Sequence, residues 1–462
     1  MLVNILVGKT LDDWNSQKNT NLQKLQQVQT WLESEVKNFS TKLTAQITQI
    51  NSIIKNQNQE QYVWKEGTQE HIGIIWDYEY DPPRSKKTKF QITFTKNKQI
   101  LYMRDGQILR TEQFKDISKK PEVLTNLEQI QNLQWVGEYG KNKFKVGNWK
   151  AIWIEQTLKD VAGLYSIEGK KQGLWKDIIK NFWSQAQAFE IGEYTNDQRK
   201  GIWKQIYMDK ELGSGEYNNQ GEKYGKWIEL SEGFNQHSQV LYNGEYKNGK
   251  KVGRWEIFYK GKYEKKFTKI GGGSYDEGGS NKIGFWMKKL FIGGGSQDEG
   301  SIKIGRWVEL SEEFYDDSQV TNNGEYKNGK KVGMWDIVAW GRKIGGGSYT
   351  EGDSTKIGSW IELSEGFKYN SQVTYKGEYK CGRKTGRWDL IFNGKLIGGG
   401  LYKEVEGDSI KVGNWIEMND QFWENFQVIY TGEYNKIGQK VGKWVEIDLE
   451  INKQLKEIKY DN

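Results

Sequence analysis

Residues 242–259 read YNGEYKNGKKVGRWEIFY, and close variants of this stretch recur over the C-terminal two-thirds of the chain. Each variant contains Gly-x-Trp, and a Tyr, usually within Gly-x-Tyr, precedes nearly every one of these tryptophans. The tryptophans of the pattern are Trp149, Trp175, Trp203, Trp227, Trp255, Trp286, Trp307, Trp335, Trp360, Trp388, Trp415 and Trp444. They recur about every 27 residues, and a fixed period of about 20–50 residues is typical of stacked repeats rather than of one globular core.

The spacing inside one unit predicts a β-hairpin. Side chains along a strand alternate between two faces, so Gly244 and Tyr246 share a face of the first strand. The sequence of residues 247–250, with Asn-Gly at its centre, predicts the turn, and Trp255 falls on the same face of the second strand. We therefore expect a ladder of stacked aromatic side chains along the repeats. Its predicted members include Tyr246, Trp255, Tyr326, Trp335, Tyr379, Trp388, Tyr434 and Trp444.

The N-terminal segment, residues 1–60, has a helical pattern from about residue 10 onward. Apolar residues follow one another by steps of three and four, which is the spacing of one helix face. They are Leu25, Val28, Leu32, Val36, Phe39, Leu43, Ile47, Ile50 and Ile54. The pattern allows two interpretations: a coiled coil that forms a homodimer through residues 10–60, or a helix folded back over the end of the repeat array.

Residues 61–134 do not follow the repeat. Stretches 90–94 and 100–102 alternate like strands, Asp105-Gly106 predicts a tight turn, and Asp81-Pro82-Pro83 breaks the chain before them. A short helix is predicted within residues 121–133. We interpret this segment as a divergent β and helix cap for the end of the array. The repeats then fill residues 135–449 as about twelve hairpins, and a charged C-terminal tail follows at 450–462.

Composition argues against several classes of function. The formal net charge is +7 over 462 residues, which is too mild to predict nucleic-acid binding. The two histidines and one cysteine cannot build a zinc site, and Cys381 occupies a predicted turn. Gly8-Lys9-Thr10 resembles the end of a phosphate-binding loop, but Val3 stands where that motif needs its first glycine. We therefore expect no catalytic residues, no metal and no cofactor.

No apolar stretch approaches the 18 or so residues of a membrane span, so we expect no transmembrane segment. Met1 to Val7 is apolar but lacks a basic flank, which does not favour a signal peptide. The single cysteine fits a reducing compartment. These observations together predict a soluble, cytoplasmic protein.

The stretch GEYKNGKKVG at 244–253, and again at 324–333, resembles the core of a MORN (membrane occupation and recognition nexus) repeat. Further matches lie at 377–386 and 432–442. The resemblance implies an elongated, single-layer, antiparallel β-meander and a scaffolding role at membranes, the cytoskeleton or cilia, often as a dimer. One departure is consistent: a Trp such as Trp255 stands where the motif has its last glycine. The bias toward Asn, Gln, Lys and Ile is similar to that of ciliate and other AT-rich protist proteins.

The predicted hairpin tips alternate between basic and acidic charge, which suggests three roles. Neighbouring tips can neutralise each other, they can support side-by-side association with a protein partner or a second copy, or the basic tips can bind anionic lipid headgroups. The candidate anionic contacts are Lys250, Lys251, Lys330, Lys331, Arg383, Lys384, Lys440 and Lys443.

From these patterns we expect a non-catalytic scaffold or adaptor that mediates protein–protein assembly, associated with the cytoskeleton, a cilium or a membrane junction. Tethering to anionic phospholipid is the alternative. A lesser alternative is binding of carbohydrate or choline by exposed aromatic cages, as other Trp- and Tyr-rich hairpin repeats do.

Overall fold

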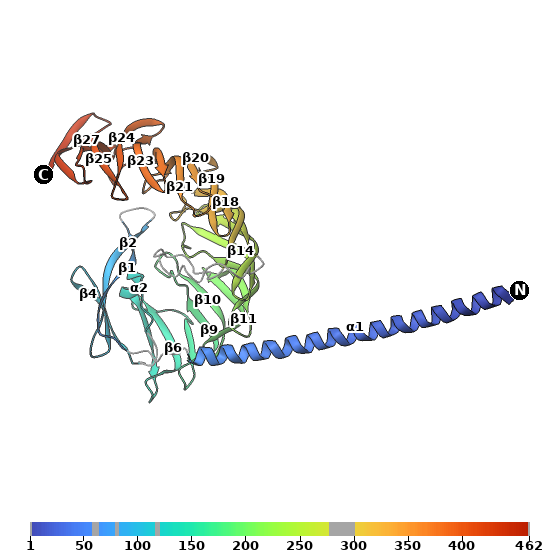
Figure 1. Ribbon diagram of the computed structural model, residues 1–462. Helices are drawn as coiled ribbons and strands as arrows, with labels where there is room; N and C mark the ends of the chain where they lie inside the picture. The colour runs from blue at the N-terminus through green and yellow to red at the C-terminus, as the bar shows by residue number, and fades with distance from the viewer. Residues whose placement is uncertain (1, 58–63, 79–82, 116–120, 277–300, 461–462) are drawn as a thin grey trace. The chain divides into compact units, whose positions relative to one another are not determined.

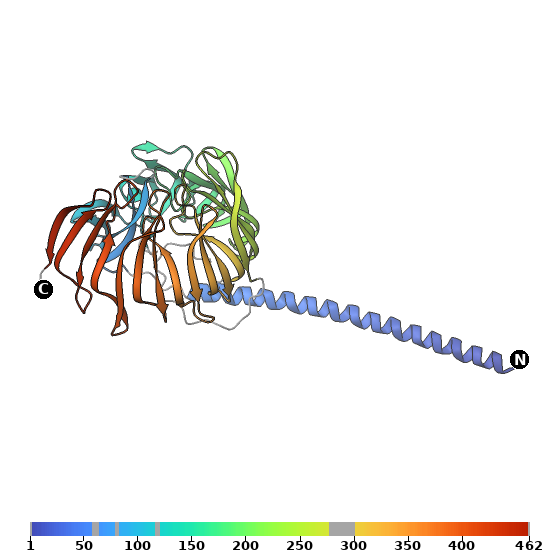
Figure 2. The ribbon, with the colours of Figure 1, turned by 90° about the horizontal axis from the view of Figure 1, so that it is seen from above.

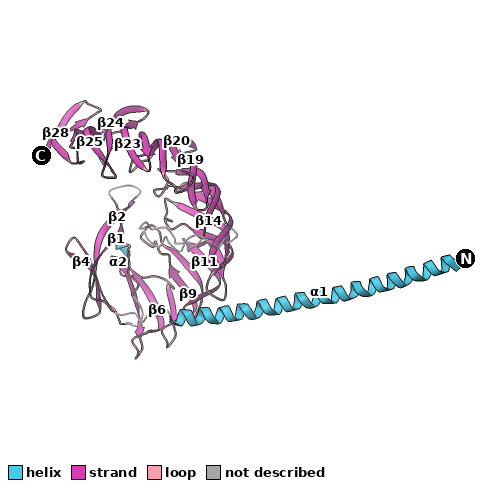
Figure 3. Ribbon diagram, in the orientation of Figure 1, coloured by secondary structure: helices cyan, strands magenta, loops and turns pink. Residues whose placement is uncertain are grey.

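A computed structural model of the protein describes residues 2–57, 64–78, 83–115, 121–276 and 301–460. One long helix stands at the N-terminus, and nearly all of the remaining elements are strands (Figures 1 and 3). The predicted fold class, a mainly β antiparallel meander of hairpins with a helical N-terminal segment, is confirmed.

Helix α1 spans Leu2–Gln57 and is drawn in blue in Figure 1. It therefore begins earlier than the apolar stripe suggests. Side chains of the helix are described over residues 14–42 and at residue 46, and every one of them is exposed. In this part of the helix the stripe residues are 50–69 % exposed: Leu25, Val28, Leu32, Val36 and Phe39. The remaining stripe members, Leu43, Ile47, Ile50 and Ile54, lie outside the described side chains.

A four-stranded sheet follows, with the order β1-β2-β3-β4. Its strands are β1 (Gly67–Asp77), β2 (Arg84–Phe94), β3 (Gln99–Arg104) and β4 (Gln107–Gln113). The predicted strands 90–94 and 100–102 lie within β2 and β3, and Asp105 and Gly106, both with positive φ, turn the chain into β4. Residues 81 and 82 of the predicted chain break lie outside the described residues.

The predicted short helix is α2 (Leu127–Asn132), and it contacts the start of the repeats. The Asn126 side chain caps it by accepting from the backbone N–H groups of residues 128 and 129. The Gln129 side-chain amide donates to the carbonyls of Lys180 and Phe182, at 3.0 and 2.8 Å. Trp76 of β1 stacks on Trp183 in the same loop.

The repeats form one antiparallel sheet whose strands follow one another in sequence order, as Figure 2 shows for the C-terminal strands. Its strands are β5 (Leu133–Tyr139), β6 (Lys145–Trp153), β7 (Gln156–Thr157), β8 (Ala162–Tyr165), β9 (Lys171–Ile178), β10 (Ala188–Thr195), β11 (Gln198–Tyr207), β12 (Lys210–Tyr217), β13 (Lys223–Leu230), β14 (Gln239–Lys247), β15 (Lys250–Lys260), β16 (Thr268–Tyr275), β17 (Lys303–Leu310), β18 (Val320–Lys327), β19 (Lys330–Ala339), β20 (Arg342–Tyr349), β21 (Lys356–Leu363), β22 (Val373–Lys380), β23 (Arg383–Phe392), β24 (Lys395–Val405), β25 (Asp408–Met418), β26 (Val428–Tyr434), β27 (Lys440–Asp448) and β28 (Lys453–Tyr460).

Strand pairing explains how this sheet is continuous. β6 pairs with β5, β7 and β8, and from β8 onward each strand pairs with the next one in the chain. β16 pairs directly with β17, where Tyr275 lies opposite Lys303. Most of the segment expected to be a charged tail is strand β28, in which Tyr460 lies opposite Gly442 of β27.

The hairpin turns follow from their residues. Asn248 and Gly249, between the paired residues Lys247 and Lys250, have φ values of 50° and 74°. Two successive positive φ values make a type I′ turn, whose twist matches that of the strands it joins. Cys381 and the glycine after it adopt the same conformation, so Cys381 is the turn residue that the sequence predicts.

Two kinds of glycine shape each unit. Gly253, the glycine of Gly-x-Trp, has a φ of 60°, which other residues rarely adopt. Gly244 lies on the neighbouring strand under the Trp255 ring, and a Cβ atom at Gly244 would come within 2.2–2.6 Å of that ring. The three-glycine runs repeat the second device, because Gly273 lies under Trp307 in the same way.

This packing predicts that Gly244→Ala destabilises the sheet. The added methyl group must displace the Trp255 indole, and overpacking of this kind costs about 1–3 kcal/mol. Urea unfolding followed by tryptophan fluorescence measures the change. Gly233→Ala is the control, since no atom lies within 4 Å of its added Cβ and its φ is not positive. Equal urea midpoints for the two variants would contradict this account of the repeat.

Candidate functional site

The aromatic side chains form one continuous ladder on one face of the repeat sheet. Tyr and Trp rings alternate from Tyr139 to Tyr460, and consecutive ring centroids lie 5.0–6.3 Å apart in edge-to-face geometry. Each such pair contributes about 0.5–1.5 kcal/mol beyond burial. The members expected from the sequence lie in it: Tyr246, Trp255, Tyr326, Trp335, Tyr379, Trp388, Tyr434 and Trp444. Trp286 lies outside the described residues.

A cation covers each described tryptophan of the ladder. It stands four positions before the tryptophan, and its charged group lies 3.9–4.7 Å from the ring centroid. These cations are Lys145, Lys171, Arg199, Lys223, Lys251, Lys303, Lys331, Lys356, Lys384, Lys411 and Lys440. With glycine beneath, tyrosines at the edges and a cation above, the indoles are only 1–5 % exposed. A single sheet thereby buries its own tryptophans.

Carboxylates tie these cations together in pairs. Glu229 accepts from Lys223 at 2.6 Å, from Lys251 at 3.0 Å and from the Tyr246 hydroxyl at 3.1 Å. The same cluster, with two cations and one tyrosine around one carboxylate, recurs four more times. The central carboxylates are Asp177, Glu229, Glu309, Glu362 and Glu417. Each cluster links cations and a tyrosine from different strands, so it fastens consecutive hairpins.

The surroundings of these groups shift their pKa values. Burial alone would raise the pKa of Glu229, but the ammonium groups of Lys251 and Lys223 outweigh burial and lower it. The pKa values of Glu309, Glu362 and Glu417 are lowered by the same balance. Burial, followed by the nearby charge of Glu417 and Glu362, raises the pKa of Tyr402 to about 12. These four glutamates are thus held in their charged form.

The eight candidate anionic contacts divide into two groups. Four of them belong to the ladder: Lys251, Lys331, Lys384 and Lys440. Each pairs with a cluster carboxylate, and Lys251 is only 6 % exposed. These lysines could reach a membrane only by leaving both the indole and the carboxylate.

The other four candidates are exposed, and three of them have partners within the chain. Lys330 donates to the carbonyl of Gly352 at 2.7 Å, Arg383 pairs with Glu404 and Lys443 pairs with Glu457, both at 2.7 Å. Lys250 stands in the turn between β14 and β15.

The alternation of tip charge leads to contacts between neighbouring tips. Lys327 of a basic tip lies 3.8 Å from Glu351 of the next acidic tip, and Arg383 reaches Glu404 in the same manner. Such exposed pairs contribute little stability, at most about 1 kcal/mol. They do show neutralisation of adjacent tips within the chain at these two places.

A feature that the sequence analysis missed lies at the strand ends opposite the hairpin tips, which we call the Phe-loop edge. Five loops there fold a phenylalanine over the ladder face of the sheet, against aliphatic and aromatic residues of the strands. We call them the Phe loops; their central residues are Phe182, Phe234, Phe314, Phe367 and Phe422. The recurrence of Ser-Glu-Gly-Phe at 231–234 and 364–367 is the signal that would have found them.

Each Phe loop is hydrogen-bonded to the next by its backbone. The N–H groups of Gln236, Asp316, Tyr369 and Glu424 donate to carbonyls of the preceding loop, at 2.8–3.1 Å. Ser238 and Ser371 side chains add bonds to the carbonyls of Phe314 and Phe422. The sheet therefore has a second ladder along this edge, independent of the aromatic one.

Substitution Glu362→Gln tests the role of the clusters. The amide keeps an acceptor for Tyr379 but leaves Lys356 and Lys384 without a counter-charge, so we expect a loss of about 1–3 kcal/mol in the free energy of unfolding. Glu378→Gln, on the exposed face of β22, is the matched control and should change stability by less than about 0.5 kcal/mol. Urea unfolding distinguishes the two results, and equal losses would contradict the cluster's role.

Acidification should weaken the sheet through the same groups. The pKa of Glu362 is lower in the folded chain than its ordinary value of 4.5, so its stabilisation is present above pH 4.5 and is lost as the pH falls through the folded pKa. We expect the urea midpoint to fall with acidification below that value. The Glu362→Gln variant should show a shallower fall, because one titrating group is gone. An unchanged slope in the variant would argue against a shifted Glu362.

Searches of the described residues for a metal site and for a membrane-spanning helix, and of the whole chain for related proteins, found no match. Among the described residues, no group of three His, Cys, Asp or Glu side chains could hold a metal ion. None of the described helices is both long and apolar enough to cross a bilayer. No protein-family model matches the chain, and no curated protein matches it.

Proposed function

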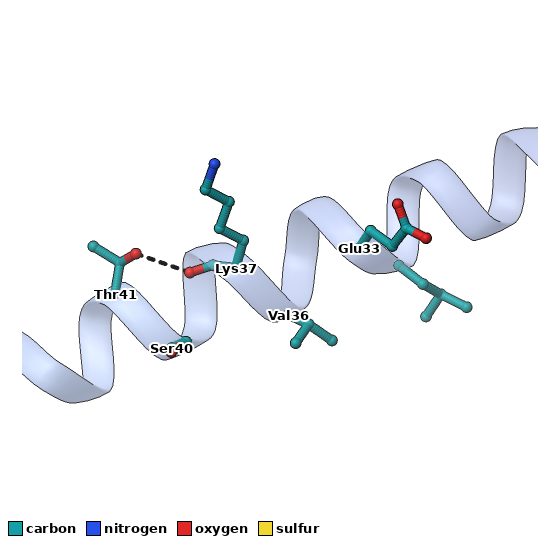
Figure 4. Close-up of a pocket in the computed structure, with 6 residues that line it drawn as sticks. Glu33, Val36, Lys37, Ser40 and Thr41 are labelled. Carbon is teal, nitrogen blue, oxygen red and sulfur yellow. Dashed lines mark hydrogen bonds between the residues drawn. The ribbon is translucent and has the colours of Figure 1, made fainter. Parts of the chain in front are cut away.

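We propose that this chain is a non-catalytic scaffold built from MORN-like hairpin repeats, which self-associates through α1 and assembles protein partners on its repeat sheet. The observation that carries the proposal is the apolar stripe of α1, whose described members are at least half exposed. Large apolar side chains repeated along one helix face are the usual sign of a partner helix. In Figure 4, Val36 projects from one side of the helix and Lys37 from the other.

The repeat sheet supports a structural rather than a chemical role. On its ladder face, the charged and aromatic side chains contact one another within the chain, as the Glu229 cluster illustrates. The exposed face instead presents the glutamate of each Gly-Glu-Tyr, such as Glu245 opposite Lys226 and Glu325 opposite Arg306. Mixed charges of this kind on a rigid sheet suit recognition of proteins, where they give specificity.

The two alternatives receive less support. Four of the eight candidate lipid contacts are held over indoles by cluster carboxylates, as Lys251 is. An aromatic cage for carbohydrate needs open ring faces, and the described ladder tryptophans are buried. From the resemblance to MORN proteins, we place the scaffold in the cytoplasm, at the cytoskeleton, a cilium or a membrane junction.

Self-association through α1 predicts that Leu32→Glu with Val36→Glu separates the copies. Each substitution removes about 1.5–3 kcal/mol of apolar burial from the assembly. The dissociation constant of the dimer should therefore rise by more than about 100-fold. Light scattering of the full chain measures the mass: a dimer for the native protein and a monomer for the variant.

Ser34→Glu with Asn38→Glu is the matched control for this test. It adds the same charges at the same spacing, about 200° around the helix from the stripe. A native chain that is monomeric at tens of micromolar, or a control that dissociates as completely as the stripe variant, would refute association through this face.

A further inference from the structure

One hairpin connection at the Phe-loop edge differs from its sisters. The hairpins β11–β12, β19–β20 and β23–β24 are joined by two-residue turns, for example Asn393-Gly394 with both φ values positive, and β27–β28 is joined by the four residues 449–452. The hairpin β15–β16 is joined instead by residues 261–267, with the sequence GKYEKKF. Insertions confined to one repeat usually mark a binding surface rather than a requirement of the array. We call this insertion the basic loop.

Several contacts hold the basic loop in one conformation. The N–H of Gly261 donates to the Glu264 carboxylate at 3.2 Å, and the N–H of Lys262 donates to Asp316 at 3.2 Å. The Tyr259 hydroxyl also donates to Asp316, and Phe267 packs against the cluster around Phe234. Both acidic side chains at its base are therefore engaged in positioning the backbone.

The positive charges of the loop are left facing solvent. Lys262, Lys265 and Lys266 are exposed, and within the described part of the chain none of them forms an ion pair. Tyr263 between them is 90 % exposed, although it is a large aromatic side chain. Tyrosine, like Trp and Arg, is enriched among the interface residues that contribute most of the binding energy.

The neighbouring Phe loop, residues 311–318, carries the opposite charge. Its Asp316 binds the base of the basic loop, while Glu312, Glu313 and Asp317 are exposed and form no ion pair among the described residues. The equivalent loops are less acidic, with Gly233 and Gly366 in the place of Glu313. A basic loop and an acidic loop thus lie side by side without neutralising each other.

We propose that these two loops form a self-complementary surface through which two copies of the chain dock about a twofold axis. In such a contact the same patch serves both partners, so the basic loop of each copy meets the acidic loop of the other. The two Tyr263 rings supply apolar area near the axis, and the charges set orientation.

The adjacent charges also decide which partner fits. An anionic membrane surface or a nucleic acid presents mainly negative charge, and Glu312, Glu313 and Asp317 would repel it at the same place where the lysines attract it. A second copy satisfies both loops at once. This contact is separate from α1 and stands whether or not the helix self-associates.

A reciprocal charge swap tests the proposal in the full chain carrying Leu32→Glu and Val36→Glu, so that α1 does not contribute. One variant carries Lys265→Glu with Lys266→Glu, and the other carries Glu312→Lys and Glu313→Lys together with Asp317→Lys, so that loop 311–318 becomes net positive. Each alone presents two loops of one sign and should lose self-association by about tenfold or more. An equimolar mixture should associate at least as well as the parent, because each acidic surface then meets a basic one.

Analytical ultracentrifugation at low salt gives the readout, and association of the parent should weaken as salt is raised because exposed charges are screened. Folding defects are controlled by the urea midpoint of each variant, and a defect cannot explain association that returns on mixing. The proposal is overturned if the parent stays monomeric at low salt, if either variant alone associates like the parent, or if the mixture does not associate.

Discussion

The repeat sheet depends on the contact between an indole ring and a glycine of the neighbouring strand. At Gly244 there is no space for even a methyl group, so the ring of Trp255 can lie flat against the backbone. That position lets Tyr246 approach the ring edge and Lys251 lie above it. A sheet of one layer usually exposes both of its faces, and here the burial that a second layer would give to one face comes from within each hairpin.

The charged clusters extend this contact from one hairpin to the next. An ammonium group over an indole is partly desolvated, which costs energy unless a carboxylate compensates. Glu229 serves both Lys223 and Lys251, which come from strands on either side of β14. The pKa of Glu229 is lowered because these two ammonium groups stabilise its charged form. Lysine and glutamate side chains, which are expected at the surface from their charge, are thereby part of the buried contacts of the sheet.

The sequence predicted the hairpins well because their determinants are local. Alternation along residues 242–259 placed Tyr246 and Trp255 on one face, and Asn248-Gly249 specified the turn. Strict alternation already places Lys251, four residues before Trp255, on the ladder face, but its charge led to the prediction that it lies at a hairpin tip. The bonds between Phe loops join residues far apart in the chain, such as Ser238 and Phe314, and no local pattern gives such pairings. The regular occurrence of a cation four places before each Trp was nevertheless visible.

From β9 to β27, each strand of the array is hydrogen-bonded to the strand before it and the strand after it in the chain. The aromatic ladder continues directly from β16 to β17, where the ring centroids of Tyr275 and Trp307 lie 5.0 Å apart, although 27 residues of sequence separate the two strands. Growth of such an array by gene duplication therefore needs no compensating change elsewhere, since a new Tyr–Trp hairpin inherits a complete set of neighbours. The number of hairpins thereby becomes a property that evolution can adjust almost independently of the rest of the sequence.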